Sequence, residues 1–149
     1  MGFDDMLIRL NAALQADGGE RLASVIREQF PVALIDEFQD TDPVQYAIFD
    51  SIYRIDENHL DSGLFLIGDP KQAIYAFRGA DIYTYLRARQ PTTGRHHTLG
   101  TNFRPSHPMV EAVNHVFQRA ETGRGPFLFR DPNGENPVQV PSVLSRGGR

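Results

Sequence analysis

The 149-residue sequence predicts an α/β fold built on a parallel sheet. Two short apolar runs, in residues 31–37 and 64–69, each end abruptly in acidic residues, which is typical of buried strands. Segments with apolar residues at helical spacing alternate with these runs, as expected for parallel strands joined by helices. A hydrophobic content of 40% with 23% charged residues indicates a globular chain with one sizeable core, or one core and part of a second.

The N-terminal third is predicted to contain two helices followed by the first strand. Residues 3–14 carry apolar side chains at helical spacing, and Asp4 and Asp5 occupy a first turn where the helix dipole favours acids. The same spacing resumes in residues 18–30 after a glycine break. The apolar run in residues 31–37 then forms the first strand.

A helix over residues 40–54 is predicted to connect the first strand to the second. Asp42 can accept hydrogen bonds from the free N–H groups of the first helical turn. Pro43 suits the first helical position, where no N–H is needed. The second strand then spans residues 64–69, and a further helix covers residues 79–89.

The rest of the chain is predicted to form a third strand, a helix and an irregular tail. The third strand is expected in residues 97–100 and the helix in residues 105–120. From Thr122 the helical spacing is lost among glycines and prolines, and the chain ends in Arg-Gly-Gly-Arg. We therefore expect residues 122–149 to be irregular.

Composition excludes several functional classes. No apolar run approaches the roughly 20 residues that a membrane span needs, and the N-terminus has no basic stretch of the kind that begins a secretory signal. The sequence contains no cysteine, which excludes disulfides and thiolate metal sites. We expect a cytoplasmic protein with no membrane partner.

Charge is unevenly distributed along the chain, although the net charge is only −4. Residues 1–61 carry thirteen Asp or Glu against four Arg, whereas residues 70–104 carry six basic residues against Asp81 alone. A net negative charge by itself would argue against a nucleic-acid partner. The basic segment instead indicates a local contact with an anionic ligand.

Carboxylates end both of the first two predicted strands. Asp36 and Glu37 follow the first strand and Asp69 follows the second. Ligands of open parallel sheets bind at this edge, and an aspartate there can hold Mg²⁺ together with substrate phosphates. A neighbouring glutamate can take a proton from an attacking water. The alternative is that residues 36–42 form only an acidic, solvated helix start, and for Asp42 the capping role is sufficient.

The loop after Asp69 combines phosphate chemistry with base-stacking chemistry. Gln72 can bind a phosphate oxygen or a water without carrying a charge. Tyr75 and Phe77, with Arg78 beside them, can form a platform for unstacked bases, worth roughly 1–3 kcal/mol per base. The alternative is that the two aromatic residues pack in the core and the arginine is a surface charge.

Arg104 is the last candidate nucleotide-site residue, and a phosphate-binding lysine loop is absent from the sequence. Arg104 follows the third predicted strand and can act as an arginine finger on a transferring phosphoryl group, although a lone arginine before a proline is more often a surface residue. Lys71 is the only lysine, and its context, Asp-Pro-Lys-Gln, is not the G-x-x-x-x-G-K-[ST] phosphate loop. The sequence therefore contains candidate metal and water-positioning residues without a phosphate cradle.

Three segments together resemble a known family. "VALIDEFQDTDP", "LIGDPKQAIYAFRGADIYTY" and "TLGTNFRPS" are similar to motifs II, III and IV of superfamily 1 DNA helicases of the UvrD/Rep/PcrA type, in the same order and spacing. The segment "GDPKQAIYAFRGADI" is most similar to the RecB family, the beta subunits of bacterial exodeoxyribonuclease V. The likeness covers about residues 3 to 119.

The resemblance implies a role for each matching residue. Asp36 would be the Walker B magnesium ligand, with Glu37 beside the metal as catalytic base for ATP hydrolysis, and Gln72 would sense the γ-phosphate. Arg104 would be the finger that reaches ATP from a second domain. Contacts with single-stranded DNA would come from Tyr75, Phe77, Arg78 and Asn102. Relatives often have tryptophan at the position of Phe77, which predicts weaker stacking here.

The resemblance also implies a division into domains. Residues 1–91 would be the later part of a first RecA-like domain, residues 92–121 the opening of a second, and residues 122–149 an irregular tail. ATP and Mg²⁺ would be the cofactors. Single-stranded or duplex DNA, the remaining domains of a parent chain, and RecC-like and RecD-like subunits would be the partners.

The leading hypothesis is a fragment of an ATP-dependent DNA helicase and exonuclease subunit that couples ATP hydrolysis to translocation on single-stranded DNA in double-strand break repair. By itself the fragment is expected to be inactive as an ATPase. The alternatives are a UvrD/Rep-type repair helicase fragment, a weak single-strand-binding module without catalysis, and a stand-alone Mg²⁺ phosphohydrolase that uses Asp36, Glu37 and Asp69.

Overall fold

The computed structural model describes residues 2–73, 81–122, 134–138 and 140–145. The chain divides into two compact units, Met1–Arg95 and His96–Arg149. Among the described residues, no helix combines the length and the apolar character that crossing a bilayer requires.

Unit 1 begins with two helices, α1 (Phe3–Gln15) and α2 (Gly19–Gln29), followed by strand β1 (Val32–Ile35) and the 3-10 turn η1 (Phe38–Asp40). Helix α3 (Pro43–Tyr53) leads to strand β2 (Gly63–Leu66). The 3-10 turn η2 (Pro70–Gln72) and helix α4 (Ile82–Arg89) complete the unit. The predicted helices and the first two predicted strands are thus present at nearly the expected positions.

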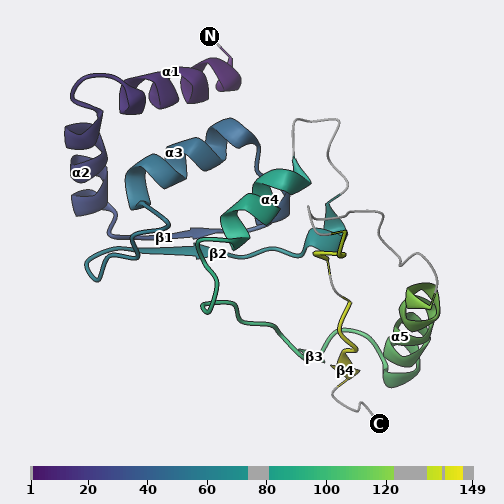
Figure 1. The fold of residues 1–149 in the computed structure, drawn as a ribbon. Helices are drawn as coiled ribbons and strands as arrows, with labels where there is room; N and C mark the ends of the chain where they lie inside the picture. Colours follow the sequence, from purple (N-terminus) through teal and green to yellow (C-terminus); the bar gives the residue numbers. More distant parts are fainter. Residues whose placement is uncertain (1, 74–80, 123–133, 139, 146–149) are drawn as a thin grey trace. The chain divides into compact units, whose positions relative to one another are not determined.

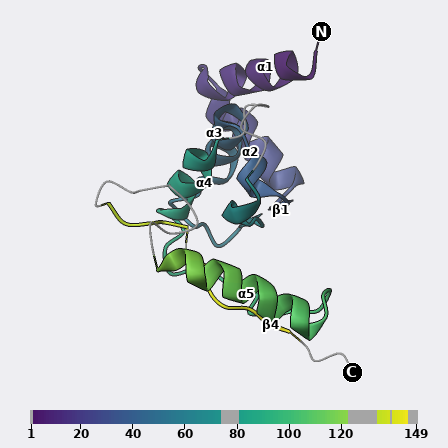
Figure 2. The same cartoon turned by 90° about the vertical axis from the view of Figure 1, so that its right-hand side faces the viewer.

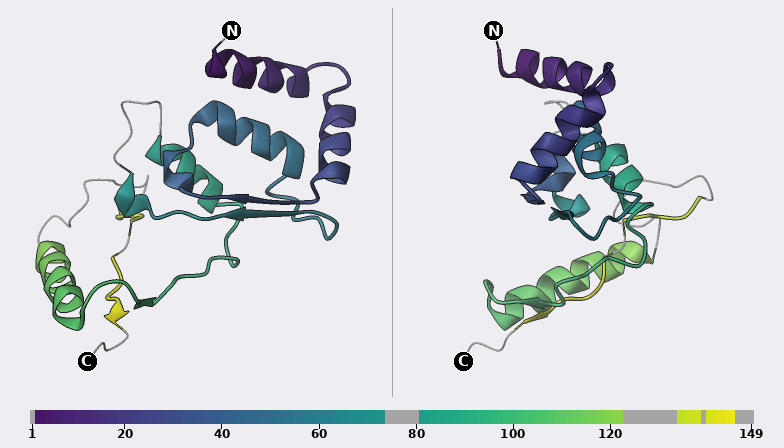
Figure 3. Two further views of the ribbon diagram at one scale, coloured as in Figure 1. Left: turned by 180° about the vertical axis from the view of Figure 1, so that it is seen from behind. Right: turned by 90° about the vertical axis from the view of Figure 1, so that its left-hand side faces the viewer.

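The two strands of unit 1 form a parallel sheet. Their register runs from Val32 opposite Gly63 to Ile35 opposite Leu66, with α3 in the connection between them. All four helices lie on the same side of this sheet (Figures 1 and 3). Because the strands are parallel, β1 and β2 end at the same edge.

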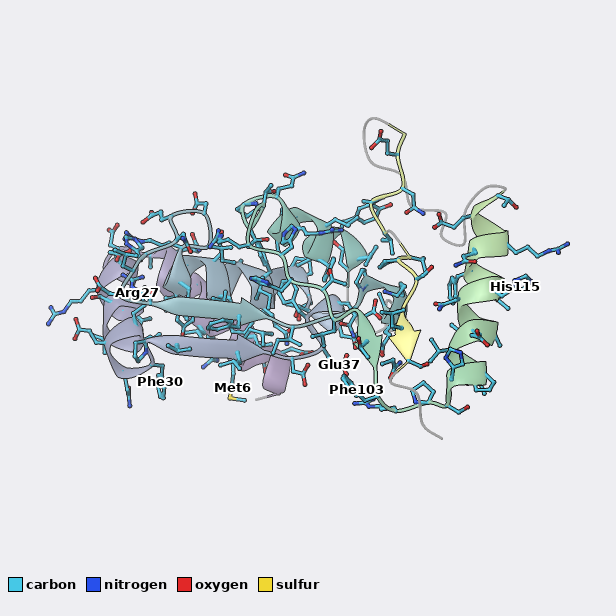
Figure 4. All side chains as sticks on the ribbon, turned by 90° about the horizontal axis from the view of Figure 1, so that it is seen from below. Met6, Arg27, Phe30, Glu37, Phe103 and His115 are labelled. Atoms are coloured by element: carbon cyan, nitrogen blue, oxygen red, sulfur yellow. The ribbon has the colours of Figure 1, made fainter. Side chains whose placement is uncertain are left out.

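The sheet is covered on one face only, which corrects the prediction of fully buried strands. Burial alternates along β1, with exposed Val32 and Leu34 between half-buried neighbours. Phe65 of β2 points to the same open side and is 57% exposed. Figure 4 views this open face, with both strands in front of the helices. The strand sequences are continuously apolar because both faces of the sheet carry apolar side chains. The helices of unit 1 pack against one of these faces.

Two groups of buried residues form the core of unit 1. The first joins α1, α2 and α3, and consists of Leu14, Ala23, Ile48, Ile52 and Tyr53. The second is formed by side chains from η1, α3, the residues just after α3, and α4, and consists of Phe38, Tyr46, Ile55 and Ala88. Leu64 of β2 packs against both groups, so the covered face of the sheet joins them.

The start of α3 forms as the sequence predicts. Asp42 is its N-cap, and its Oδ1 accepts hydrogen bonds from the N–H groups of Val44 (2.7 Å) and Gln45 (2.9 Å). The Gln45 side chain returns a hydrogen bond to the Asp42 N–H, which completes a capping box. Pro43 occupies the first helical position. This cap fixes where the chain leaves η1 and enters α3.

Unit 2 contains strand β3 (Thr101–Asn102), helix α5 (His107–Glu121) and strand β4 (Leu144–Ser145). The third strand was expected in residues 97–100, but these residues form no regular element and the strand begins at Thr101. Strand β4 lies inside the segment that was expected to be irregular, and pairs in parallel with β3.

Side chains of α5 hold the segment that contains β4, with Asn114 making two of the contacts and Gln118 and His107 bonding to Ser142 and Ser145. Asn114 of α5 donates a hydrogen bond to the Val143 carbonyl (2.8 Å) and accepts one from the Val143 N–H (3.1 Å). This bidentate contact holds the segment before β4 alongside α5 (Figure 2). Hydrophobic periodicity carries no signal for a strand of two residues fixed in this way.

Candidate active site

The carboxylates predicted to form the site follow β1 directly. Figure 4 labels Phe30 before this strand and Glu37 after it, at opposite ends of the sheet. Glu37 has φ 50° and ψ 41°, a left-handed conformation that non-glycine residues rarely adopt. Asp36 supports it, since its Oδ1 accepts a hydrogen bond from the Glu37 N–H at 2.9 Å. Both side chains are exposed, so they are accessible to a ligand.

Phe38 anchors the turn that displays these carboxylates. Its N–H donates to the Ile67 carbonyl at 2.8 Å, which ties the end of β1 to the end of β2. Its ring is 2% exposed and contacts the rings of Tyr46 on α3 and Tyr85 on α4, with centroids 6.3 and 6.0 Å away. The buried Phe38 ring therefore fixes the backbone of the turn that carries the Asp36 and Glu37 carboxylates.

The second half of the site is the turn after β2. Asp69 caps η2: its Oδ1 accepts from the Lys71 N–H (3.0 Å) and from Lys71 Nζ (2.7 Å). Its Oδ2 accepts from Gln72 Nε2 at 3.3 Å. Burial opposes ionisation of Asp69, but these hydrogen bonds from Lys71 and Gln72 outweigh it and hold the pKa of the carboxyl below its ordinary value. The turn is thus organised around a stable carboxylate.

Gln39 joins the two halves of the site, and the sequence analysis did not identify it. It lies in η1 and is only 1% exposed. Its Nε2 donates to Glu37 Oε2 at 2.6 Å, while its Oε1 accepts from the Asp69 N–H at 3.0 Å. No sequence signal marked this glutamine, because its role depends on the fold bringing the Asp69 N–H to its side-chain oxygen.

The structure brings some of the predicted site residues together. Asp36, Glu37, Asp69 and Gln72 gather at the edge where β1 and β2 end, connected through Gln39. Arg104 and Asn102 belong to unit 2, where the Arg104 N–H donates to Asn102 Oδ1 at 3.1 Å and both side chains are exposed. The predicted DNA-contacting residues Tyr75, Phe77 and Arg78 lie outside the described residues.

The donor set at the strand ends fits Mg²⁺ held jointly with phosphates. Within the described segments, no three His, Asp or Glu side chains gather as a metal cage. Mg²⁺ does not require one, because it is usually bound by one or two carboxylates and completed by phosphate oxygens and water. Asp36 and Glu37 each use one carboxylate oxygen in the hydrogen bonds described above. Their other oxygens make no hydrogen bond within the part of the chain that is described.

The family of the chain follows from comparison with known proteins. The model of the UvrD/REP helicase N-terminal domain matches residues 1–93, which is more than half of the sequence and includes both turns of the site. The chain belongs to the UvrD/REP helicase family. Individual UvrD/REP relatives extend the likeness further along the chain.

Three of these relatives are RecB subunits of RecBCD enzymes. The chain is 53% identical over 131 residues to RecB of Escherichia coli K12 and 49% identical over 129 residues to RecB of Haemophilus influenzae. It is 45% identical over 130 residues to RecB of Mycobacterium tuberculosis H37Rv. These matches cover 87–88% of this chain but 10–11% of the relatives, so the chain spans about a tenth of their length.

Proposed function

We propose that this chain is a motor segment of a RecB-type, ATP-dependent DNA helicase subunit, and that its parent protein couples ATP hydrolysis to movement along single-stranded DNA during double-strand break repair. The observation that supports this most directly is the connected carboxylate and glutamine arrangement at the strand ends of a UvrD/REP family chain. The likeness to RecB subunits favours this function over the single-strand-binding module and the stand-alone phosphohydrolase.

In this proposal unit 1 is part of a RecA-like domain and its strand-end edge binds the nucleotide. Asp36 holds Mg²⁺, which neutralises charge on the phosphates when bound. Glu37 accepts the proton of the attacking water, and the oxygen that is not bonded to Gln39 is available for it. Gln72, exposed at the start of the loop, contacts the γ-phosphate.

The remaining predicted residues act outside this edge. Arg104 supplies the arginine finger from the second RecA-like domain, of which unit 2 is the opening. Single-stranded DNA is contacted by Tyr75, Phe77 and Arg78 from the loop and by Asn102 beside Arg104. RecC-like and RecD-like subunits are the partners of the parent protein.

The 149-residue chain alone is expected not to hydrolyse ATP, because its only lysine, Lys71, is paired with Asp69 and belongs to no phosphate loop. The test is therefore a hybrid in which this sequence replaces the corresponding segment of Escherichia coli RecB. DNA-stimulated ATP hydrolysis by the hybrid subunit is measured, and Glu37→Gln is expected to abolish it.

Glu28→Gln is the matched control for this experiment. Glu28 lies in the last turn of α2, before the start of β1, whereas Glu37 follows the end of that strand; within the described residues its side chain accepts one long hydrogen bond, from Ser24 (3.3 Å). The control hybrid should keep its activity. A folded hybrid without ATP hydrolysis, or one that remains active with Glu37→Gln, would contradict the proposed function, as would robust hydrolysis by the chain alone.

A further inference from the structure

We propose that Gln39 is a positioning residue that couples the Glu37 carboxylate to the turn carrying Gln72. The inference deepens the proposed function and rests on it for its catalytic meaning. Its structural content, a hydrogen-bonded connection between the two strand ends, is independent of ATP hydrolysis.

The connection is continuous over three hydrogen bonds. Gln39 Nε2 donates to Glu37 Oε2 (2.6 Å), and Gln39 Oε1 accepts from the Asp69 N–H (3.0 Å). Asp69 Oδ2 then accepts from Gln72 Nε2 (3.3 Å). The first and last members of this chain are the exposed groups assigned to water activation and γ-phosphate contact. A displacement at either end therefore changes the hydrogen bonding of the other.

Steric confinement keeps Gln39 in this bridging position. Its side chain is almost fully buried, and Gly68 lies against it. A Cβ at Gly68 would lie 2.8 Å from Gln39 Oε1 and 3.1 Å from the backbone nitrogens of Gln39 and Phe38. The absence of a side chain at Gly68 thus provides the space that the amide occupies.

The glutamine amide satisfies both ends of the bridge. The Glu37 carboxylate needs a donor, whereas the Asp69 N–H needs an acceptor, and glutamine carries one of each at the end of the same side chain. Glutamate would keep the acceptor and lose the donor. Methionine would fill similar space and lose both. A buried amide with both partners satisfied orients its neighbours in the way that outer-shell residues orient metal ligands.

The connection is tested by NMR on the 149-residue chain. Glu37→Gln is introduced as a perturbation, and the amide signals of Asp69 and of the Gln72 side chain are followed. In the otherwise native chain both signals are expected to move well beyond their linewidth. In a Gln39→Met background this movement is expected to be lost. Gln15→Met, which removes an amide that donates to Ser51 Oγ, is the control and should preserve it.

Gln39→Glu is the second variant. It should keep slow hydrogen exchange at the Asp69 N–H, because the acceptor remains, whereas Gln39→Met should speed that exchange. Equal responses in the native and Gln39→Met backgrounds would overturn the proposal. Loss of the dispersed spectrum in both Gln39 variants would overturn it as well, since the residue would then be needed for the fold itself.

A kinetic measurement separates this inference from the proposed function. In the RecB hybrid, Gln39→Met is expected to lower kcat about 10-fold or more with little change in the KM for ATP. The Glu37 carboxylate would no longer be held in position, whereas the side chains assigned to nucleotide binding would be unchanged. A parallel rise in KM with unchanged kcat would contradict positioning. If the hybrid hydrolyses no ATP while the NMR coupling is observed, the proposed function fails and the structural connection stands.

Discussion

Glu37 combines local backbone strain with an accessible side chain. A left-handed conformation at a non-glycine residue costs on the order of 1–3 kcal/mol, and it persists only where the surroundings fix it. Here the Phe38 anchor, the Asp36 contact and the Gln39 bridge all act on the same turn. Arg54 and Asn58 also have positive φ, but of these three residues only Glu37 belongs to the candidate site.

Residue type alone identified part of this site. Asp36, Glu37 and Gln72 could be selected because acids and an amide at strand ends suggest metal and phosphate chemistry. Gln39 could not, because an isolated glutamine has no periodicity, charge or spacing that marks it as buried. Its role depends on the approach of Gly68, two residues beyond the end of β2, a contact that the linear sequence does not contain.

Gly68→Ala is expected to destabilise unit 1 by about 1–3 kcal/mol, because the added methyl group would press on Gln39 and on the η1 backbone. Urea unfolding followed by circular dichroism measures the change. Gly63→Ala, at the start of β2, is the matched control, since its Cβ would meet Phe65 at an ordinary 3.5 Å. That control should stay within about 0.5 kcal/mol of the native chain. Equal effects of the two substitutions would contradict the steric argument.

Asp69 is expected to make stability depend on pH. Its pKa is lower in the folded chain than its ordinary value of 3.8, so its contribution is present above that value and is lost as the pH falls through the folded-state pKa. The side chain is 34% exposed, so solvent screening reduces the contribution to about 1 kcal/mol at neutral pH. The difference in unfolding free energy between the native chain and Asp69→Asn should be constant from pH 7 to 5 and shrink below pH 4. A difference that grows on acidification would disprove this assignment.

At the scale of elements, the helices were predictable and the strands only partly so. Helices α1, α2 and α5 repeat an apolar stripe over several turns, and α3 also has the Asp42 and Pro43 start signal. Strands β1 and β2 have apolar residues on both faces, which the sequence could not distinguish from full burial. Strand β4 depends on contacts with side chains of α5, including Asn114, so it had no local signal.

Asp42→Ala is expected to cost about 1–2 kcal/mol, because two N–H groups of the first turn of α3 would lose their acceptor. Thermal and urea unfolding measure the loss. Asp61→Ala is the control, since Asp61 is exposed and its carboxylate makes no hydrogen bond within the described residues. It should change stability by less than about 0.5 kcal/mol. If Asp42→Ala were equally silent, Asp42 would not act as the cap.

At the scale of the whole molecule, the core is unevenly divided. Both buried apolar clusters belong to unit 1. Among the described residues of unit 2, the buried apolar side chains are Val110 and Val138. Unit 1 also has an open sheet face, with Leu34 66% and Phe65 57% exposed. Contiguous apolar surface of this kind usually marks an interface, and it fits a segment whose relatives are about ten times longer.

We expect residues 1–95 to fold without the rest of the chain, and residues 96–149 to fail to do so alone. The shorter piece would depend on the 15-residue α5 and two strands of two residues, and isolated helices of that length are marginal in water. Circular dichroism and urea unfolding of the two pieces measure this. In residues 1–95, Asp42→Ala should cost the same as in the full chain to within about 0.5 kcal/mol, because distant and independent sites are additive. A cooperative transition in residues 96–149, or its absence from residues 1–95, would show that the two units stabilise each other.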